Sequence, residues 1–237
     1  MSIDYFDIEI TDAVSSFGPQ NAIIACYQNN DPLACANIDR DPATGALWIG
    51  SGNVRDLNIN TGGFQTKGWD LSVAYSGVEM GRFGSLNFNL TGTLVDELVE
   101  DPGGGFAPFD CAGMYSGECG AGRGIPNPEW RHHFRIGWES PWNVDASLTW
   151  RYYDSVELFR ANSPEQLDFE LDEQNYFDLT AEWHVTEKAS VLLGINNVLD
   201  EDPPLSGAVG TDGNGNTYPQ TYDALGRWIF LRGSIGF

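Results

Sequence analysis

The chain has 237 residues, with 34 Asp and Glu against 12 Lys and Arg, and its formal net charge is −22. This balance excludes nucleic-acid binding, because phosphates are bound by surfaces rich in Lys and Arg. A content of 13% aromatic and 41% hydrophobic residues argues against a disordered acidic chain. No run of about eighteen apolar residues occurs, so no transmembrane helix is predicted, but a membrane-spanning β-strand needs no such run.

Apolar and polar residues alternate with a period of two along the whole chain, which is the pattern of β-strands with two different faces. The clearest case is residues 85–94, where Leu86, Phe88 and Leu90 point to one side and polar residues to the other. One or two helical turns are expected between residues 12 and 24. Eight strands are predicted, at about residues 5–10, 69–75, 85–94, 134–138, 144–153, 176–185, 191–195 and 229–237.

The connections between these strands alternate in length. The long or medium connections are residues 11–53, 100–128, 160–174 and 200–222, and the short ones are 76–84, 140–143 and 186–188. This alternation is typical of outer-membrane barrels, which have long loops outside and tight turns in the periplasm. The sequence therefore predicts an all-β, antiparallel transmembrane β-barrel segment in contact with outer-membrane lipid. An interfacial aromatic girdle is expected from Trp69, Tyr75, Trp130, Trp138, Trp150, Tyr152, Trp183 and Trp228.

The four cysteines form two local pairs, Cys26 with Cys35 and Cys111 with Cys119, each within a long connection. Four cysteines allow three pairings, and local disulfides in an oxidising compartment are the simplest of them. The N-terminal residues are acidic where a signal peptide is basic and then apolar. This start indicates either a cytosolic protein or the downstream part of a longer one, and the cysteines favour the second.

Four segments carry a family resemblance: residues 2–11 (containing DYFDIEI), 60–71 (NTGGFQTKGWDL), 194–204 (GINNVLDEDPP) and 222–237. They resemble strands in the C-terminal part of the barrel of TonB-dependent outer-membrane receptors. The resemblance implies a longer protein with a barrel of about 22 strands and an internal plug. Residues 1–237 would be its last eight or so strands, without the plug or the N-terminal barrel strands. Contact with the TonB complex would then occur only through the missing N-terminal region.

The same resemblance implies a receptor and transporter in the bacterial outer membrane, active in the uptake of a scarce nutrient of the siderophore, vitamin or oligosaccharide type. The alternative is a self-contained eight-stranded barrel with a structural or adhesive role, since eight strands can close by themselves. That alternative requires the strand at residues 5–10 to pair with the strand at 228–237. A soluble acidic enzyme would need a catalytic constellation, and none stands out, so neither an enzyme nor a cofactor is predicted.

Candidate ligand-binding residues lie on the polar side of two neighbouring predicted strands. They are Arg131, His133 and Arg135 on one strand, and Arg151 and Tyr153 on the next. The competing interpretation is that these side chains form salt bridges across the barrel wall or toward a plug. The acidity of the loops favours a neutral sugar or a cation-bearing chelate over an anionic ferric chelate as the small nutrient ligand.

Two further predictions concern the C-terminal region. Asp212, Asn214, Asn216 and Asp223 are a weak candidate calcium site, for which a tight polar turn is the simpler interpretation. Phe237 ends an alternating apolar strand, and in the family such a terminus resembles the signal read by the barrel assembly machinery. The simpler role for Phe237 is that of the last lipid-facing residue.

Overall fold

The computed structural model describes residues 1–60, 62–103, 105–119, 125–161, 167–207 and 214–236. Contacts divide the chain into two compact units. The first consists of Met1–Phe6, Gly68–Asp96 and Cys111–Phe237, and the second of Asp7–Lys67 and Glu97–Asp110. No helix in the described part of the chain is long and apolar enough to cross a membrane.

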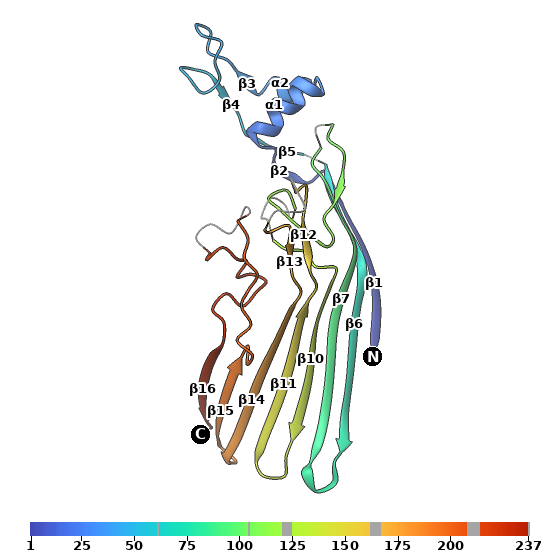
Figure 1. The fold of residues 1–237 in the computed structure, drawn as a ribbon. Helices are drawn as coiled ribbons and strands as arrows, with labels where there is room; N and C mark the ends of the chain where they lie inside the picture. The colour runs from blue at the N-terminus through green and yellow to red at the C-terminus, as the bar shows by residue number, and fades with distance from the viewer. Residues whose placement is uncertain (61, 104, 120–124, 162–166, 208–213, 237) are drawn as a thin grey trace. The chain divides into compact units, whose positions relative to one another are not determined.

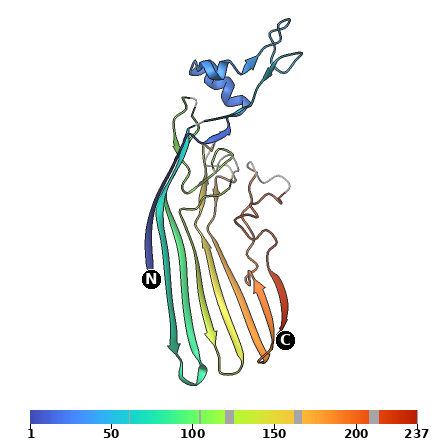
Figure 2. The same ribbon diagram turned by 180° about the vertical axis from the view of Figure 1, so that it is seen from behind.

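One large sheet contains all eight strands that the alternating pattern predicts (Figure 1). In sheet order they are β1 (Ser2–Thr11), β6 (Gly63–Glu79), β7 (Ser85–Asp101), β10 (Trp130–Glu139), β11 (Val144–Tyr153), β14 (Gln174–Thr186), β15 (Ala189–Asn196) and β16 (Trp228–Ile235). From β7 to β16, each strand pairs antiparallel with the next. The order places β1 and β16 at opposite edges (Figure 2), so the pairing that a self-contained eight-stranded barrel requires is absent from the described strands.

Tight turns join β6 to β7, β10 to β11 and β14 to β15 at the same end of the sheet (Figure 1). The first turn contains a short 3-10 helix (Gly81–Phe83) and ends at Gly84, whose φ is 90°. A Cβ at Gly84 would lie 2.0 Å from the carbonyl oxygen of Glu139 on the neighbouring strand. Glycine is therefore required there both by the backbone conformation and by the close approach of the next strand.

The two faces of the sheet differ as the alternation predicts. One apolar row crosses six strands by direct register partners, in the order Phe88, Ile136, Leu148, Leu179, Ile195 and Ile229. Leu148, Leu179 and Ile229 are 40%, 43% and 65% exposed, so the described residues leave this side, the apolar face, uncovered. The adjacent residues Arg135, Thr149 and Asp178 lie on the other side, the polar face. An uncovered apolar face opposite a polar face is the arrangement of a barrel wall with lipid outside.

Aromatic side chains gather on the apolar face, as expected for a girdle. Trp150 stacks on Phe177 at 6.2 Å between ring centroids and meets His132 edge-on at 4.4 Å. His132 is buried between these rings, and its Nδ1 accepts a hydrogen bond from Trp130 Nε1 at 2.9 Å.

The prediction for Trp228 was wrong. Its register partner is Asn196, and it packs against Phe230 at 5.0 Å on the polar face. A Cβ at Gly194 would lie 2.1 Å from the Phe230 ring, so Phe230 covers the bare backbone of Gly194 on that same face. Trp228 therefore has the opposite orientation to the girdle residues, because it is one residue out of phase with Ile229.

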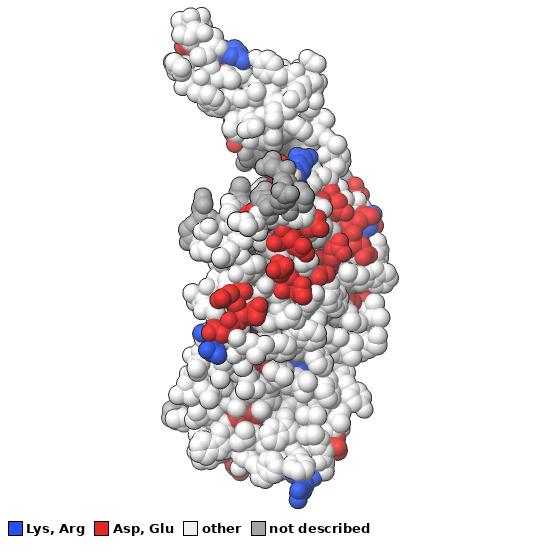
Figure 3. All heavy atoms as spheres, in the orientation of Figure 1, with Lys and Arg blue, Asp and Glu red and all other residues white. Residues whose placement is uncertain are grey.

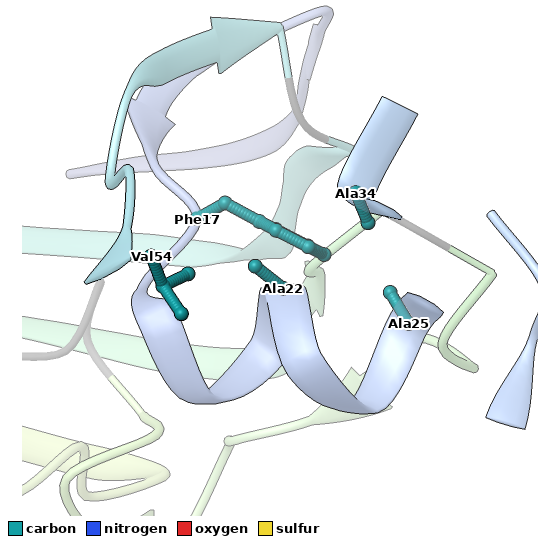
Figure 4. Close-up of a cluster of buried hydrophobic side chains, with 5 residues drawn as sticks. All are labelled: Phe17, Ala22, Ala25, Ala34 and Val54. Atoms are coloured by element: carbon teal, nitrogen blue, oxygen red, sulfur yellow. The ribbon is translucent and has the colours of Figure 1, made fainter. Parts of the chain in front are cut away.

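The second unit has a small core of its own (Figure 4), formed by Phe17, Ala22, Ala25, Ala34 and Val54. Its elements include β2 (Val14–Ser16), α1 (Pro19–Gln28), α2 (Pro32–Cys35), β3 (Ile38–Asp39), β4 (Asn53–Val54) and β5 (Asn58–Asn60). Helix α1 is longer and lies further along the chain than the expected turns. A disulfide between Cys26 and Cys35 joins the two helices.

A second small core lies in the long connections of the first unit. It consists of Tyr115, Val156, Leu171, Tyr218 and Tyr222, and is called the tyrosine core below. Three short strands contribute to it, β9 (Met114–Tyr115), β12 (Val156–Leu158) and β13 (Glu170–Leu171). A disulfide between Cys111 and Cys119 closes the loop that contains β9. Strands this short carry no readable alternation, so the sequence did not predict them.

Candidate ligand-binding site on the polar face

The structure places the five candidate residues on the polar face of adjacent strands. Arg131, His133 and Arg135 alternate along β10, and their register partners on β11 are Tyr153, Arg151 and Thr149. Side chains two residues apart in a strand point to the same face, so the five form one contiguous surface.

Arg151 is fully engaged within the protein. Its guanidinium makes two hydrogen bonds with Asp178, at 2.7 and 3.1 Å, and two with Asp223, at 3.0 and 2.5 Å. The guanidinium also lies over the ring of Tyr176, 4.9 Å from its centroid. The three charged side chains are only 15 to 20% exposed. Two bidentate pairs in a sheltered position are strong interactions, so Arg151 holds Asp223 on the wall instead of binding a ligand.

The sequence did not indicate Asp178 as the partner of Arg151, although a signal was available. Asp178 lies on β14 with the same parity as Tyr176, and Tyr176 is the register partner of Arg151. Asp178 also accepts a hydrogen bond from the backbone N–H of Asn197 at 2.9 Å. The connection that follows β15 is thus attached to the wall at two points, Asn197 and Asp223.

The weak calcium candidate gains no support. Both carboxylate oxygens of Asp223 accept hydrogen bonds from Arg151, and Asp212 lies outside the described residues. In the portion of the chain that the structure describes, no group of three or more His, Cys, Asp or Glu residues is placed to hold a metal ion. Phe237 also lies outside the described residues.

A hollow of about 390 Å³ opens on the polar face of the first unit. This volume is within the range of small-molecule sites. Three of the candidate residues line it, Arg131, His133 and Tyr153, whereas Arg135 and Arg151 do not. The remaining lining comes from β1, β6, β7 and β10: Ser2, Asp4, Asp70, Leu71, Ser72, Thr91, Gly92, Thr93 and His132.

Charged and hydroxyl groups follow one another across the hollow. Asp70 on β6 accepts a hydrogen bond from the Thr93 hydroxyl on β7 at 2.7 Å, and Thr93 is the register partner of Arg131 on β10. Among the described residues, the Arg131 side chain has no carboxylate partner, and the Asp4 side chain has no hydrogen-bond or ion-pair partner. The sequence did not indicate Asp4 or Asp70, because they come from strands far from β10 along the chain.

Tyr153 connects the hollow with the tyrosine core. Its ring meets Tyr222 edge-on at 6.3 Å and Tyr176 at 6.4 Å. Burial raises the pKa of Tyr222, whose hydroxyl has no hydrogen-bond partner in the described structure. Burial also raises the pKa of Tyr115 to about 12, and the Tyr115 hydroxyl donates a hydrogen bond to the carbonyl oxygen of Asp168. These phenols therefore remain neutral at physiological pH.

The surface around the strands is strongly acidic. Figure 3 shows Asp and Glu gathered in one band over the upper part of the strands, with few Lys or Arg in view. Glu157 of β12 and Glu170 of β13 are exposed and are direct register partners, and Asp172 and Glu173 follow them. Such a surface disfavours the approach of anions.

A sheet with one apolar and one polar face, whose strands are joined by tight turns at one end, has the arrangement found in the walls of outer-membrane β-barrels. Residues 1–198 match the family model described as TonB dependent receptor-like, beta-barrel. The chain belongs to this family of receptors.

Solved structures agree in fold. A ferric enterobactin receptor variant from Pseudomonas aeruginosa, in complex with enterobactin, superimposes with a TM-score of 0.60 at 12% identity, covering 99% of this chain and 29% of that one. Another variant of that receptor gives a TM-score of 0.57 at 11% identity, covering 99% and 28%. The chain therefore spans less than a third of the length of these receptors. A comparison with curated protein sequences gives no significant match.

Proposed function

We propose that the chain forms the C-terminal barrel wall of a receptor in the bacterial outer membrane that actively takes up a scarce nutrient, of the siderophore, vitamin or oligosaccharide type. The observation that carries this proposal is the hollow on the polar face of a sheet from this family, with Arg131 free of any carboxylate partner in the described structure. Uptake of a small molecule requires polar groups on the inner side of the wall, and this hollow supplies them.

The partners follow from the two faces. The apolar face contacts outer-membrane lipid, and the polar face contacts the nutrient. Coupling to the TonB complex takes place through a part of the receptor outside residues 1–237, and the C-terminal strand is read by the barrel assembly machinery through Phe237.

Growth under nutrient limitation tests the proposal. A strain lacking the gene is compared with its parent and with a complemented strain under limitation for iron, copper, cobalamin, oligosaccharide or short peptides. The mutant is expected to grow poorly on at least one source. Accumulation of that nutrient in the parent is expected to stop when the proton gradient is dissipated. Equal growth of all strains on every source, or accumulation that persists without the gradient, would contradict active uptake.

A further inference from the structure

The hollow carries opposite charges on its two sides. The acidic side consists of Asp4 on β1 and Asp70 on β6, and the basic side consists of Arg131 on β10. Strand β7 runs between the two sides and contributes Thr91 and Thr93. The site is thus a row of carboxylate, hydroxyl and guanidinium groups across consecutive strands.

Among the described residues of this chain, these charges keep unused capacity for hydrogen bonds and ion pairs. Asp4, Asp70 and Arg131 are exposed. Asp70 accepts only the Thr93 hydroxyl among the hydrogen bonds seen in the described ranges, so its carboxylate keeps acceptor capacity. The contrast with Arg151 is direct, because Arg151 is occupied by Asp178 and Asp223. A charged group without a counter-charge in the protein gains most from a ligand that brings one.

The spacing of the strands that carry the charges sets the scale of the ligand. Neighbouring strands lie about 4.8 Å apart, so the backbones at Asp70 and Arg131, two strands apart, are separated by roughly 10 Å. An extended peptide advances about 3.4 Å per residue, so three residues span a comparable distance.

We propose that the hollow binds a small zwitterion, with its ammonium group on the Asp4 and Asp70 side and its carboxylate on Arg131. A short peptide is the representative of this class. This inference rests on the proposed uptake function and gives the hollow a ligand class of its own, in place of the siderophore, vitamin or oligosaccharide types. The guanidinium of Arg131 binds a carboxylate through two parallel hydrogen bonds, and the hydroxyls of Thr91 and Tyr153 bind the polar centre of the ligand.

Ligands of a single charge fit less well. An anion is repelled by Asp4, Asp70 and the acidic surface in Figure 3, and a cation is repelled by Arg131. A neutral sugar leaves both sides without a counter-charge. Specificity for a zwitterion therefore arises from repulsion of the competing ligands as well as from attraction of the correct one.

Calorimetry with triglycine and its capped derivatives tests the proposal on the full-length protein, purified in detergent. Triglycine is expected to bind saturably, and acetylation of its amino end or amidation of its carboxyl end is expected to weaken binding about tenfold or more, as for other charge-assisted hydrogen bonds. In Arg131→Gln the free and amidated peptides are expected to bind equally. In a variant with Asp4→Asn and Asp70→Asn, the free and acetylated peptides are expected to bind equally.

Arg135→Gln is the matched control, because Arg135 lies on the same strand and face but outside the hollow. It is expected to bind triglycine as the parent does, and heat-modifiable mobility verifies that each variant is folded. Equal binding of free and doubly capped triglycine to the parent, or no saturable binding at millimolar concentrations, would overturn the proposal.

The two proposals fail separately. Energy-dependent uptake of another nutrient, with no binding of triglycine, refutes the zwitterion site and leaves the uptake function standing. Charge-dependent binding of triglycine, with no energy-dependent accumulation of any nutrient, supports the site and refutes the uptake function.

Discussion

Arg151 attaches the connection between β15 and β16 to the barrel wall, and its replacement by Met gives the sharpest stability prediction. The substitution keeps much of the aliphatic stem but removes the four hydrogen bonds to Asp178 and Asp223. Removing one partner of a sheltered ion pair costs about 3 kcal/mol, because a carboxylate is left without its counter-charge. Asp178 keeps the N–H of Asn197, so the loss is expected to fall mainly on Asp223.

Hydrogen exchange measured by mass spectrometry is the assay. In Arg151→Met, the amides around Asp223 are expected to exchange about 100-fold faster than in the parent, which corresponds to about 3 kcal/mol of local opening. The amides of β11 and β14 are expected to keep their protection. Arg135→Gln is the control on the same face and is expected to leave exchange unchanged. Unaltered exchange around Asp223 in Arg151→Met would refute the role of Arg151 as the attachment point.

Four further substitutions and one change of pH have defined outcomes. Gly194→Val places a Cβ 2.1 Å from the Phe230 ring and is expected to lower the temperature midpoint of unfolding, measured by the heat-induced change in gel mobility. In the control Gly233→Ala, the new Cβ meets nothing within 4 Å, and the midpoint is expected to stay unchanged. Tyr222→Phe removes a buried hydroxyl that lacks a partner among the described residues, so it is expected to be neutral or to stabilise the fold by up to about 1 kcal/mol. Tyr115→Phe removes a hydrogen bond and is expected to destabilise the fold by a similar amount. Burial raises the pKa of Tyr115 from 10.0 to about 12. The neutral phenol therefore stabilises the folded protein fully below pH 10, and this stabilisation is expected to be lost as the pH rises toward 12. The phenolate absorbance of Tyr115 should therefore appear late in an alkaline titration, and a Tyr115 signal at pH 10 would refute its burial.

The strands could be predicted from the sequence because each has one apolar and one polar face. Alternation over eight or more residues, as in Leu86 to Leu94, follows directly from that difference between the faces. The short strands β9, β12 and β13 could not be predicted, since two or three residues show no period. The position of Trp228 near a strand end favours the girdle, but its phase with Ile229 places it on the polar face.

The candidate site was only partly predictable for a related reason. Alternation along single strands indicated Arg131, His133 and Tyr153. The approach of Asp70 to Arg131 depends on which strands are neighbours and on their register, and neither can be read from one strand. The pairing of Arg151 with Asp223 depends on the path of a long connection, which carries no period at all.

The proposed barrel wall has lipid on its apolar face and water on its polar face. Spin labels at Leu192 and Leu193 test it most directly, because these are identical neighbours on opposite faces of β15. Leu193 pairs with Ala181 and Leu231, and Leu192 pairs with Glu182 and Arg232. Both cysteine pairs are joined in disulfides, so an introduced cysteine can be labelled selectively.

In outer membranes, the label at Leu193 is expected to be relaxed strongly by oxygen and weakly by a water-soluble nickel chelate, and the label at Leu192 is expected to show the reverse. Equal accessibility of the two labels to the nickel chelate, or the opposite assignment, would contradict the account.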